Sequence, residues 1–274
     1  MKLFHILAIL ISLSAVFCFI NYRFFKLPAA IGLMLIAMLA SLALLLLGPL
    51  SLGLKEDVAI LLASIDFDET LLHGMLSLLL FAGALHVNLD DLARQRWVIA
   101  ILATVGVLGA TLMIGYMVYG VFGLFGLEVP FIYCLLFGAL VSPTDPIAVL
   151  GILKQAGAAK TLETKIVGES LFNDGVAVVV FIVLLSIATG EGDVTVLFIA
   201  GLFAQEVVGG VIFGLAIGSL AFWMLKQVDD YTVEVLITLA LTMGGYTLAE
   251  WLHISAPIAI VVAGLLIGNQ GRKF

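Results

Sequence analysis

Long apolar stretches recur along the whole chain, and they are the feature that most restricts its possible folds. Segments of about 20 apolar residues are long enough to cross the hydrocarbon core of a bilayer as α-helices. Of the 274 residues, 63% are hydrophobic and 11% are charged, whereas a soluble domain carries about 25% charged residues. The stretches also lack the polar–apolar alternation of membrane β-barrel strands. The sequence therefore predicts an all-α polytopic membrane protein.

Nine segments have the length and composition of membrane spans. We place them near residues 3–20, 27–48, 71–88, 97–122, 130–151, 165–188, 196–225, 233–252 and 255–269. The first segment is interpreted as a retained helix, because no small-x-small cleavage site follows it and further spans do.

The loop charges predict an orientation for these spans. Ten of the twelve Lys and Arg residues fall on one side of the membrane: Arg23, Lys26, Arg94, Arg96, Lys154, Lys160, Lys165, Lys226, Arg272 and Lys273. The other side carries Lys2 and Lys55 together with acidic runs at 56–57 and 66–69. Because short basic loops remain in the cytoplasm, we expect the N-terminus outside and the C-terminus inside. No basic stripe indicates a nucleic-acid partner.

Several acidic residues lie inside predicted spans, where a charge is expensive. Asp145, Glu169 and Asp174 are deep in their segments, and so is Glu206. A charge at the bilayer centre costs at least ~2.5–3.5 kcal/mol on insertion scales. All twelve Lys and Arg residues are in loops or at span ends. Only protons, bound cations or protein outside this chain could therefore neutralise these carboxylates.

Two prolines interrupt the fifth predicted span beside one of these acids. In the run 142–146, Pro143 and Pro146 flank Thr144 and Asp145. Each proline lacks an N–H and clashes with the preceding turn, so we predict a discontinuous helix. Unwound backbone at this depth is tolerated where it lines a cavity or is buried in protein. Its carbonyls, the Thr144 hydroxyl and the Asp145 carboxylate are oxygen ligands suited to Na⁺ or Li⁺.

A second polar motif, residues 168–175, enters the sixth predicted span. On a helix, Ser170 and Asp174 share one face, and Glu169 and Asn173 share the adjoining one. Asp174 follows Lys165 by nine residues, which is roughly 13 Å of helical rise and too deep for a helix cap. The ion- and proton-binding residues that we predict are Asp174, Asp145, Thr144, Ser170 and Asn173.

A buried carboxylate can be neutralised by either a proton or a small cation, which suggests exchange. If the two cannot bind together and the protein reorients only when neutralised, their fluxes are coupled. A cation channel lined by acids is the nearest alternative. An intramembrane aspartyl enzyme using Asp145 and Asp174 would typically carry its catalytic acid in a Gly-x-Gly-Asp segment. Neither aspartate lies in one, and the Gly-x-Gly-Asp run at 190–193 falls between two predicted spans. We therefore expect a transporter, not an enzyme, with no cofactor and with Na⁺ favoured over Li⁺ or K⁺ as the cation that is exchanged for H⁺.

The motifs at 142–146 and 169–175 resemble those of the monovalent cation:proton antiporter-1 (Na⁺/H⁺ exchanger) family. The segment 255–269 is similar to a later segment of that family. The resemblance implies an inverted-repeat fold, a homodimer, and a bacterial plasma-membrane location. It also implies that Asp174 is the principal ion- and proton-carrying carboxylate, with Thr144, Asp145 and Ser170 completing the cation site. The pair Asn173-Asp174 implies electroneutral exchange, and Glu169 would pair with an arginine on a later helix.

Two departures from the family pattern affect these expectations. Many relatives carry an acid in the third span, where this chain has Ala82 between Phe81 and Gly83. Relatives also have more spans, so residues 1–274 would be a partial exchanger domain with an incomplete second repeat. We expect this chain not to exchange ions alone, and robust exchange in proteoliposomes would contradict that. Alternatives are K⁺/H⁺ exchange and an inactive fragment that binds a full-length partner.

Overall fold

The computed structural model describes residues 3–46, 74–145, 157–190 and 195–270. Within these ranges the chain is helical or irregular and contains no strand. The described residues form two compact units, one of residues 3–46 with 157 and one of the remainder. Pro146 and the acidic runs at 56–57 and 66–69 lie outside the described residues.

The first unit is a pair of apolar helices joined by a tight turn. α1 spans Leu3–Ile20, the π-helical turn η1 spans Asn21–Phe25, and α2 spans Ala29–Leu46. Asn21 is buried at the turn, where its amide nitrogen donates to the Leu27 carbonyl at 2.8 Å. Its amide oxygen accepts from the Leu27 N–H at 3.3 Å, so one side chain closes the turn in both directions.

The second unit contains the remaining helices. Its first half comprises α4 (Ser77–His86), α5 (Leu89–Arg94), α6 (Arg96–Ile101), the π-helical η4 (Leu102–Gly106), α7 (Val107–Leu124) and α8 (Phe131–Val141). Its second half comprises α10 (Lys160–Thr189), α11 (Val196–Phe203), the π-helical η5 (Ala204–Val208), α12 (Gly209–Leu225), α13 (Tyr231–Leu239), the π-helical η6 (Ala240–Gly244), α14 (Gly245–Trp251) and α15 (Ala256–Gln270).

Apolar helical segments occupy the predicted spans. Five are long and apolar enough to cross a membrane: Ala8–Phe25, Arg96–Leu124, Lys160–Thr189, Leu197–Leu225 and Tyr231–Trp251. Four shorter ones are Ile31–Leu46, Gly74–His86, Phe131–Val141 and Ala256–Gln270. Each coincides with one predicted span, so the prediction of an all-α polytopic protein is confirmed. The predicted orientation and inverted repeat stay predictions.

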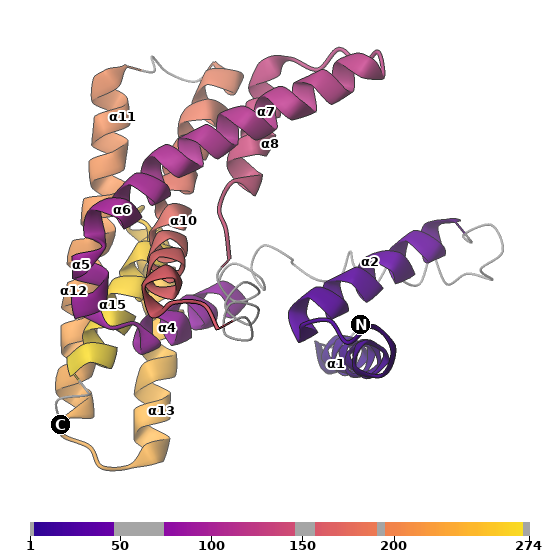
Figure 1. The fold of residues 1–274 in the computed structure, drawn as a ribbon. Coiled ribbons are helices and arrows are strands. Elements are labelled where there is room, and N and C mark those ends of the chain that lie inside the picture. The colour runs from indigo at the N-terminus through magenta and orange to yellow at the C-terminus, as the bar shows by residue number, and fades with distance from the viewer. Residues whose placement is uncertain (1–2, 47–73, 146–156, 191–194, 271–274) are drawn as a thin grey trace. The chain divides into compact units, whose positions relative to one another are not determined.

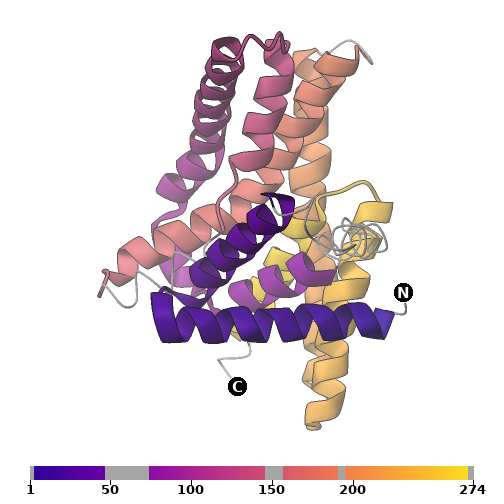
Figure 2. The ribbon, with the colours of Figure 1, turned by 90° about the vertical axis from the view of Figure 1, so that its right-hand side faces the viewer.

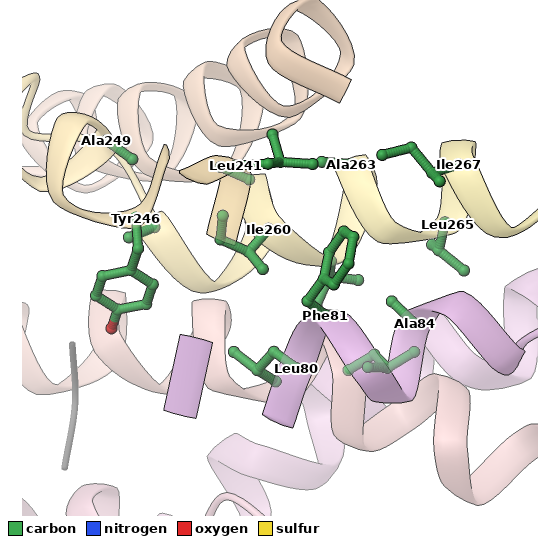
Figure 3. Close-up of a cluster of buried hydrophobic side chains, with 14 of the residues drawn as sticks. Leu80, Phe81, Ala84, Leu241, Tyr246, Ala249, Ile260, Ala263, Leu265 and Ile267 are labelled. Atoms are coloured by element: carbon green, nitrogen blue, oxygen red, sulfur yellow. The ribbon is translucent and has the colours of Figure 1, made fainter. Parts of the chain in front are cut away.

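Small residues let α15 pack closely against two neighbours, α12 and α4. A side chain on Gly218 of α12 would lie 2.8 Å from Cα of Ala263, and one on Gly264 would lie 3.1 Å from the carbonyl of Phe81. Such close backbone approach is typical of helices that associate in lipid. Figure 3 shows the resulting interface, in which Phe81 and Ala84 of α4 face Ile260 and Leu265 of α15.

α7 and α8 form a second close pair, and they lie side by side in both views (Figure 1 and Figure 2). A side chain on Gly138 would lie 3.1 Å from the backbone nitrogen of Gly115. At the connecting end of the pair, the ring of Phe131 packs on those of Tyr116 and Tyr119, with centroids 4.7 and 5.4 Å away. This closely packed pair carries the segment that follows α8.

Candidate functional site

The first part of the site is the segment that leaves α8. The helix ends at Val141, and residues 142–145 continue without helical structure. Pro143 has no N–H to continue the helical hydrogen-bond ladder. Ser142 fastens the start of the segment, because its hydroxyl donates to the Ala139 carbonyl at 3.1 Å and accepts from the Thr111 hydroxyl at 3.3 Å. Both hydroxyl side chains are buried, so this hydrogen bond holds the start of the segment against α7.

The second part is α10, which presents the motif of residues 169–174 without interruption. Glycines on two sides let neighbouring helices approach it: Gly168 adjoins Ile99 of α6, and Gly175 adjoins Ile258 of α15. The motif therefore lies in a helix that is held between other elements of the same unit.

Asn173 of α10 joins the two parts. Its amide nitrogen donates to Oε1 of Glu169 at 2.9 Å, one turn earlier on the same helix. The same nitrogen lies 3.2 Å from the Thr144 hydroxyl and 3.4 Å from the Thr144 carbonyl. Asn173 is fully buried, whereas its partners Thr144 and Glu169 are exposed and partly buried, respectively. The side chain thus fastens the non-helical segment to α10.

Thr144 completes a network of hydroxyl and carboxylate groups. Its hydroxyl donates to Oε2 of Glu169 at 3.0 Å and lies 3.2 Å from the Ser170 hydroxyl. The Ser170 hydroxyl is itself 3.3 Å from the same Glu169 oxygen. Glu169 therefore accepts from the three polar side chains around it, and this arrangement orients the Thr144 and Ser170 hydroxyls.

Asp174 and Asp145 lie at the edge of this network. Asp174 is half-buried and within electrostatic range of both Asp145 and Glu169. Asp145 and Thr144 are exposed in the isolated chain, whereas Ser170 is buried. The structure therefore brings Thr144, Glu169, Ser170 and Asn173 into direct contact and places two further carboxylates nearby. The second flanking proline, Pro146, lies outside the described residues.

One oxygen in the network is left without a partner. The amide oxygen of Asn173 is buried and accepts no hydrogen bond from any described atom. The Glu169 carboxylate fixes the amide orientation, because only the nitrogen can donate to it at 2.9 Å. A buried acceptor without a partner costs roughly 1–3 kcal/mol. A buried amide oxygen without a hydrogen-bond donor is suited to bind a small cation. The oxygens of the neighbouring hydroxyl and carboxylate groups also favour cation binding here.

Two residues near the site were missed by the sequence reasoning. Thr111 belongs to no motif, and its contact with Ser142 is made across 31 residues of chain. Tyr246 of α14 is almost completely buried and is within electrostatic range of Asp174 and Glu250. Its phenol oxygen points out of the apolar cluster in Figure 3. The sequence offers no signal for either contact, because each depends on which helices pack together.

Glu206, the remaining acid inside a span, lies elsewhere in the unit. Its backbone carbonyl in η5 accepts from the Ser255 N–H at 3.2 Å, and its carboxylate is within electrostatic range of His253. The neighbouring Gln205 donates to the His253 carbonyl at 2.8 Å. These contacts link η5 to the turn before α15. Across the described ranges, no cluster of three or more His, Cys, Asp or Glu side chains could hold a resident metal ion.

Known proteins are similar to this chain along nearly its whole length. The sequence profile of the family described as "Sodium/hydrogen exchanger, transmembrane" matches residues 9–274. The Na⁺/H⁺ antiporter NhaP of Pseudomonas aeruginosa is 54% identical over 270 residues, which cover 98% of this chain and 64% of the relative. The Na⁺/H⁺ antiporter NhaH of Halobacillus dabanensis is 33% identical over 277 residues, covering 98% and 63%. The chain thus spans less than two thirds of the length of these relatives.

Proposed function

The chain belongs to the sodium/hydrogen exchanger family, and on this premise we propose that its site binds Na⁺ and H⁺ in turn, as the ion site of a one-for-one exchanger whose transport also needs the spans that this chain lacks relative to its relatives. The observation that carries the proposal is the contact of Thr144 with Glu169, Ser170 and Asn173, which joins a non-helical segment to α10 beside two aspartates. In an integral membrane protein such unwound backbone beside a helix is a common ion-binding arrangement.

Asp174 is the carboxylate that alternates between the two ions. A proton or a Na⁺ neutralises it and removes most of the cost of a charge inside the membrane. The ligands proposed for Na⁺ are the carboxylates of Asp174 and Asp145, the hydroxyls of Thr144 and Ser170, and the unpartnered amide oxygen of Asn173. Since the same carboxylate serves both ions, their binding is competitive.

Glu169 and Asn173 support the site and do not carry the exchanged charge. Glu169 accepts hydrogen bonds from Thr144 and Asn173, so its oxygens are already engaged. The amide of Asn173 cannot titrate, which leaves one proton-carrying group in the Asn173-Asp174 pair. This supports exchange of one Na⁺ for one H⁺, which moves no net charge.

The setting of the exchanger is also part of the proposal. The bacterial origin of the close relatives supports a plasma-membrane location. The family resemblance supports a homodimer. Saturable, voltage-independent exchange would distinguish this function from a cation channel, which passes current.

The test is Na⁺ binding to the purified protein as a function of pH. Competition with one proton predicts that the apparent Kd for Na⁺ rises about tenfold per pH unit as the solution is acidified through the proton-bound range. Asp174→Asn should abolish this dependence and weaken Na⁺ binding. Glu206→Gln removes another acid inside a span and is the matched control. It should leave the Na⁺ affinity and its pH dependence unchanged. An Na⁺ affinity independent of pH would refute the proposal, and parallel measurements with Li⁺ and K⁺ give the cation preference.

A further inference from the structure

A pocket lies at the turn between α1 and α2, wholly within the first unit. Its volume is about 720 Å³. The lining includes Cys18 near the end of α1, Tyr22 and Arg23 of η1, Lys26 after η1, and Ala29 at the start of α2. One short stretch of chain therefore forms the pocket, and the hydrogen bonds that close the turn also hold its shape.

The lining of this pocket carries two positive charges and no negative one. Arg23 and Lys26 both belong to it, and the chain has no Asp or Glu before Glu56. Neither basic side chain makes an ion pair with any residue that the structure describes. The helix pair itself therefore supplies no counter-ion for these two charges, and an anionic ligand would complement them.

Lys26 holds its place in the pocket at a cost in backbone energy. It has φ 55° and ψ 27°, which is the left-handed conformation. Its N–H donates to the Asn21 carbonyl at 2.7 Å, so the turn imposes this conformation. Glycine usually occupies such a position after a helix, because it has no Cβ to crowd the backbone. Backbone strain of this kind gathers at binding sites, and a lysine here favours a function for its ammonium group.

The surroundings of the pocket identify the kind of anion. The loop charges predict that this turn faces the cytoplasm, where the lipid surface is anionic and basic pockets between spans bind headgroups. Tyr22 is 81% exposed, and tyrosine beside basic residues is typical of the membrane–water interface. The Arg23 guanidinium lies over the Phe24 ring, 5.8 Å from its centroid. That contact uses the face of the guanidinium and leaves its N–H groups available to a phosphate.

We propose that this pocket binds the headgroup of an anionic phospholipid, with its phosphate between Arg23 and Lys26. Val16 and Phe19, on the last turns of α1, are exposed and offer apolar surface to the acyl chains. A lipid satisfies the two charges and this apolar surface together, which a free phosphate does not. The inference stands on the pocket and its charges, and it does not depend on Na⁺/H⁺ exchange.

The two cysteines of the chain allow a test on the unaltered protein. Cys18 lines the pocket and is exposed, whereas Cys134 is buried. In detergent micelles, added phosphatidylglycerol should suppress alkylation of Cys18 by a maleimide, and the same amount of phosphatidylcholine should not. Cys134 should stay unlabelled throughout, which shows that the fold is intact. Equal protection by the two lipids, or the same protection by inorganic phosphate alone, would overturn the proposal.

Lys26→Gly separates binding from folding, because its two expected effects are opposite. Glycine relieves the left-handed backbone, so the midpoint of thermal unfolding should stay or rise. Protection of Cys18 should nevertheless need about tenfold more phosphatidylglycerol, the size expected for one charge-assisted hydrogen bond. Arg23→Gln should show the same loss, and Arg94→Gln, which removes a charge on the same predicted side but outside the pocket, should not. Equal losses in Arg23→Gln and Arg94→Gln would show only diffuse attraction to basic loops and would refute the pocket.

Discussion

Replacing Asn173 by alanine removes two hydrogen bonds and one unpartnered oxygen at once, which gives a testable energy balance. The two amide hydrogens are shared among Glu169 and Thr144, at 2.9 to 3.4 Å. Losing one charge-assisted and one neutral hydrogen bond costs about 2–4 kcal/mol. Removing the buried, unpartnered oxygen returns roughly 1–3 kcal/mol. Without Na⁺, the two effects largely offset each other, and we expect a net destabilisation of about 1 kcal/mol.

Adding Na⁺ should reveal the function of that oxygen. At a concentration of 100 times its Kd, a ligand of the folded state stabilises it by about 2.7 kcal/mol. If the Asn173 oxygen is a ligand, Na⁺ stabilises Asn173→Ala much less than it stabilises the unaltered chain. The difference in stability between the two proteins therefore increases with the Na⁺ concentration. Thermal unfolding in Na⁺ and in choline measures the difference.

Asn269→Ala is the matched control for this experiment. Asn269 also joins separate elements, since its amide donates to Val87 and Leu265 at 2.8 Å and accepts from the Leu89 N–H at 2.9 Å. Its loss should destabilise the fold equally with and without Na⁺. The reasoning fails if Na⁺ stabilises Asn173→Ala as strongly as the unaltered chain, or if both variants respond to Na⁺ alike.

Two further predictions concern packing and loop charge. Gly214→Ala should destabilise the protein by about 1–3 kcal/mol, because the new Cβ would overlap the Ala259 carbonyl and lie within 3.0 Å of its Cα. In Gly201→Ala the new Cβ has no neighbouring atom within 4 Å, and the variant should be more stable by about 0.5–1 kcal/mol because alanine has the higher helix propensity. Thermal unfolding measures both variants, and an equal change in stability in the two would contradict the packing account. The Lys160 ammonium donates a hydrogen bond to Asp91 at 2.9 Å and holds the pKa of that carboxyl below its ordinary value of 3.8. The Lys160–Asp91 ion pair thus stabilises the fold at pH values above 3.8, and this contribution is lost as the pH falls through the lowered pKa. Lys160→Met should raise the pKa of Asp91 in an NMR titration, and an unchanged pKa would show that Lys160 does not lower it.

Local signals in the sequence were sufficient to predict where the spans lie and which residues make up the two site segments. Apolar length marked each span, because a bilayer imposes that length directly. Pro143 marked the end of α8, since a missing N–H acts within one turn of helix. The spacing of Glu169 and Asn173 placed them on one face of α10, where they hydrogen-bond.

Contacts between distant segments could not be predicted in this way. The Thr111–Ser142 hydrogen bond and the approach of Tyr246 to Asp174 depend on which helices pack together, and no local pattern encodes a partner. The unpartnered oxygen of Asn173 is a similar case, since it exists only because Thr144 and Glu169 occupy the nitrogen. The π-helical turn η5 likewise has no marker in its sequence.

Counting the protons released when Na⁺ binds tests the competition between the two ions at Asp174 most directly. The purified chain, in weakly buffered solution at a pH where the site is protonated, should release one proton for each Na⁺ bound. Asp174→Asn should release none, while Glu206→Gln should behave as the unaltered chain. Na⁺ binding without proton release, or full release from Asp174→Asn, would contradict the account.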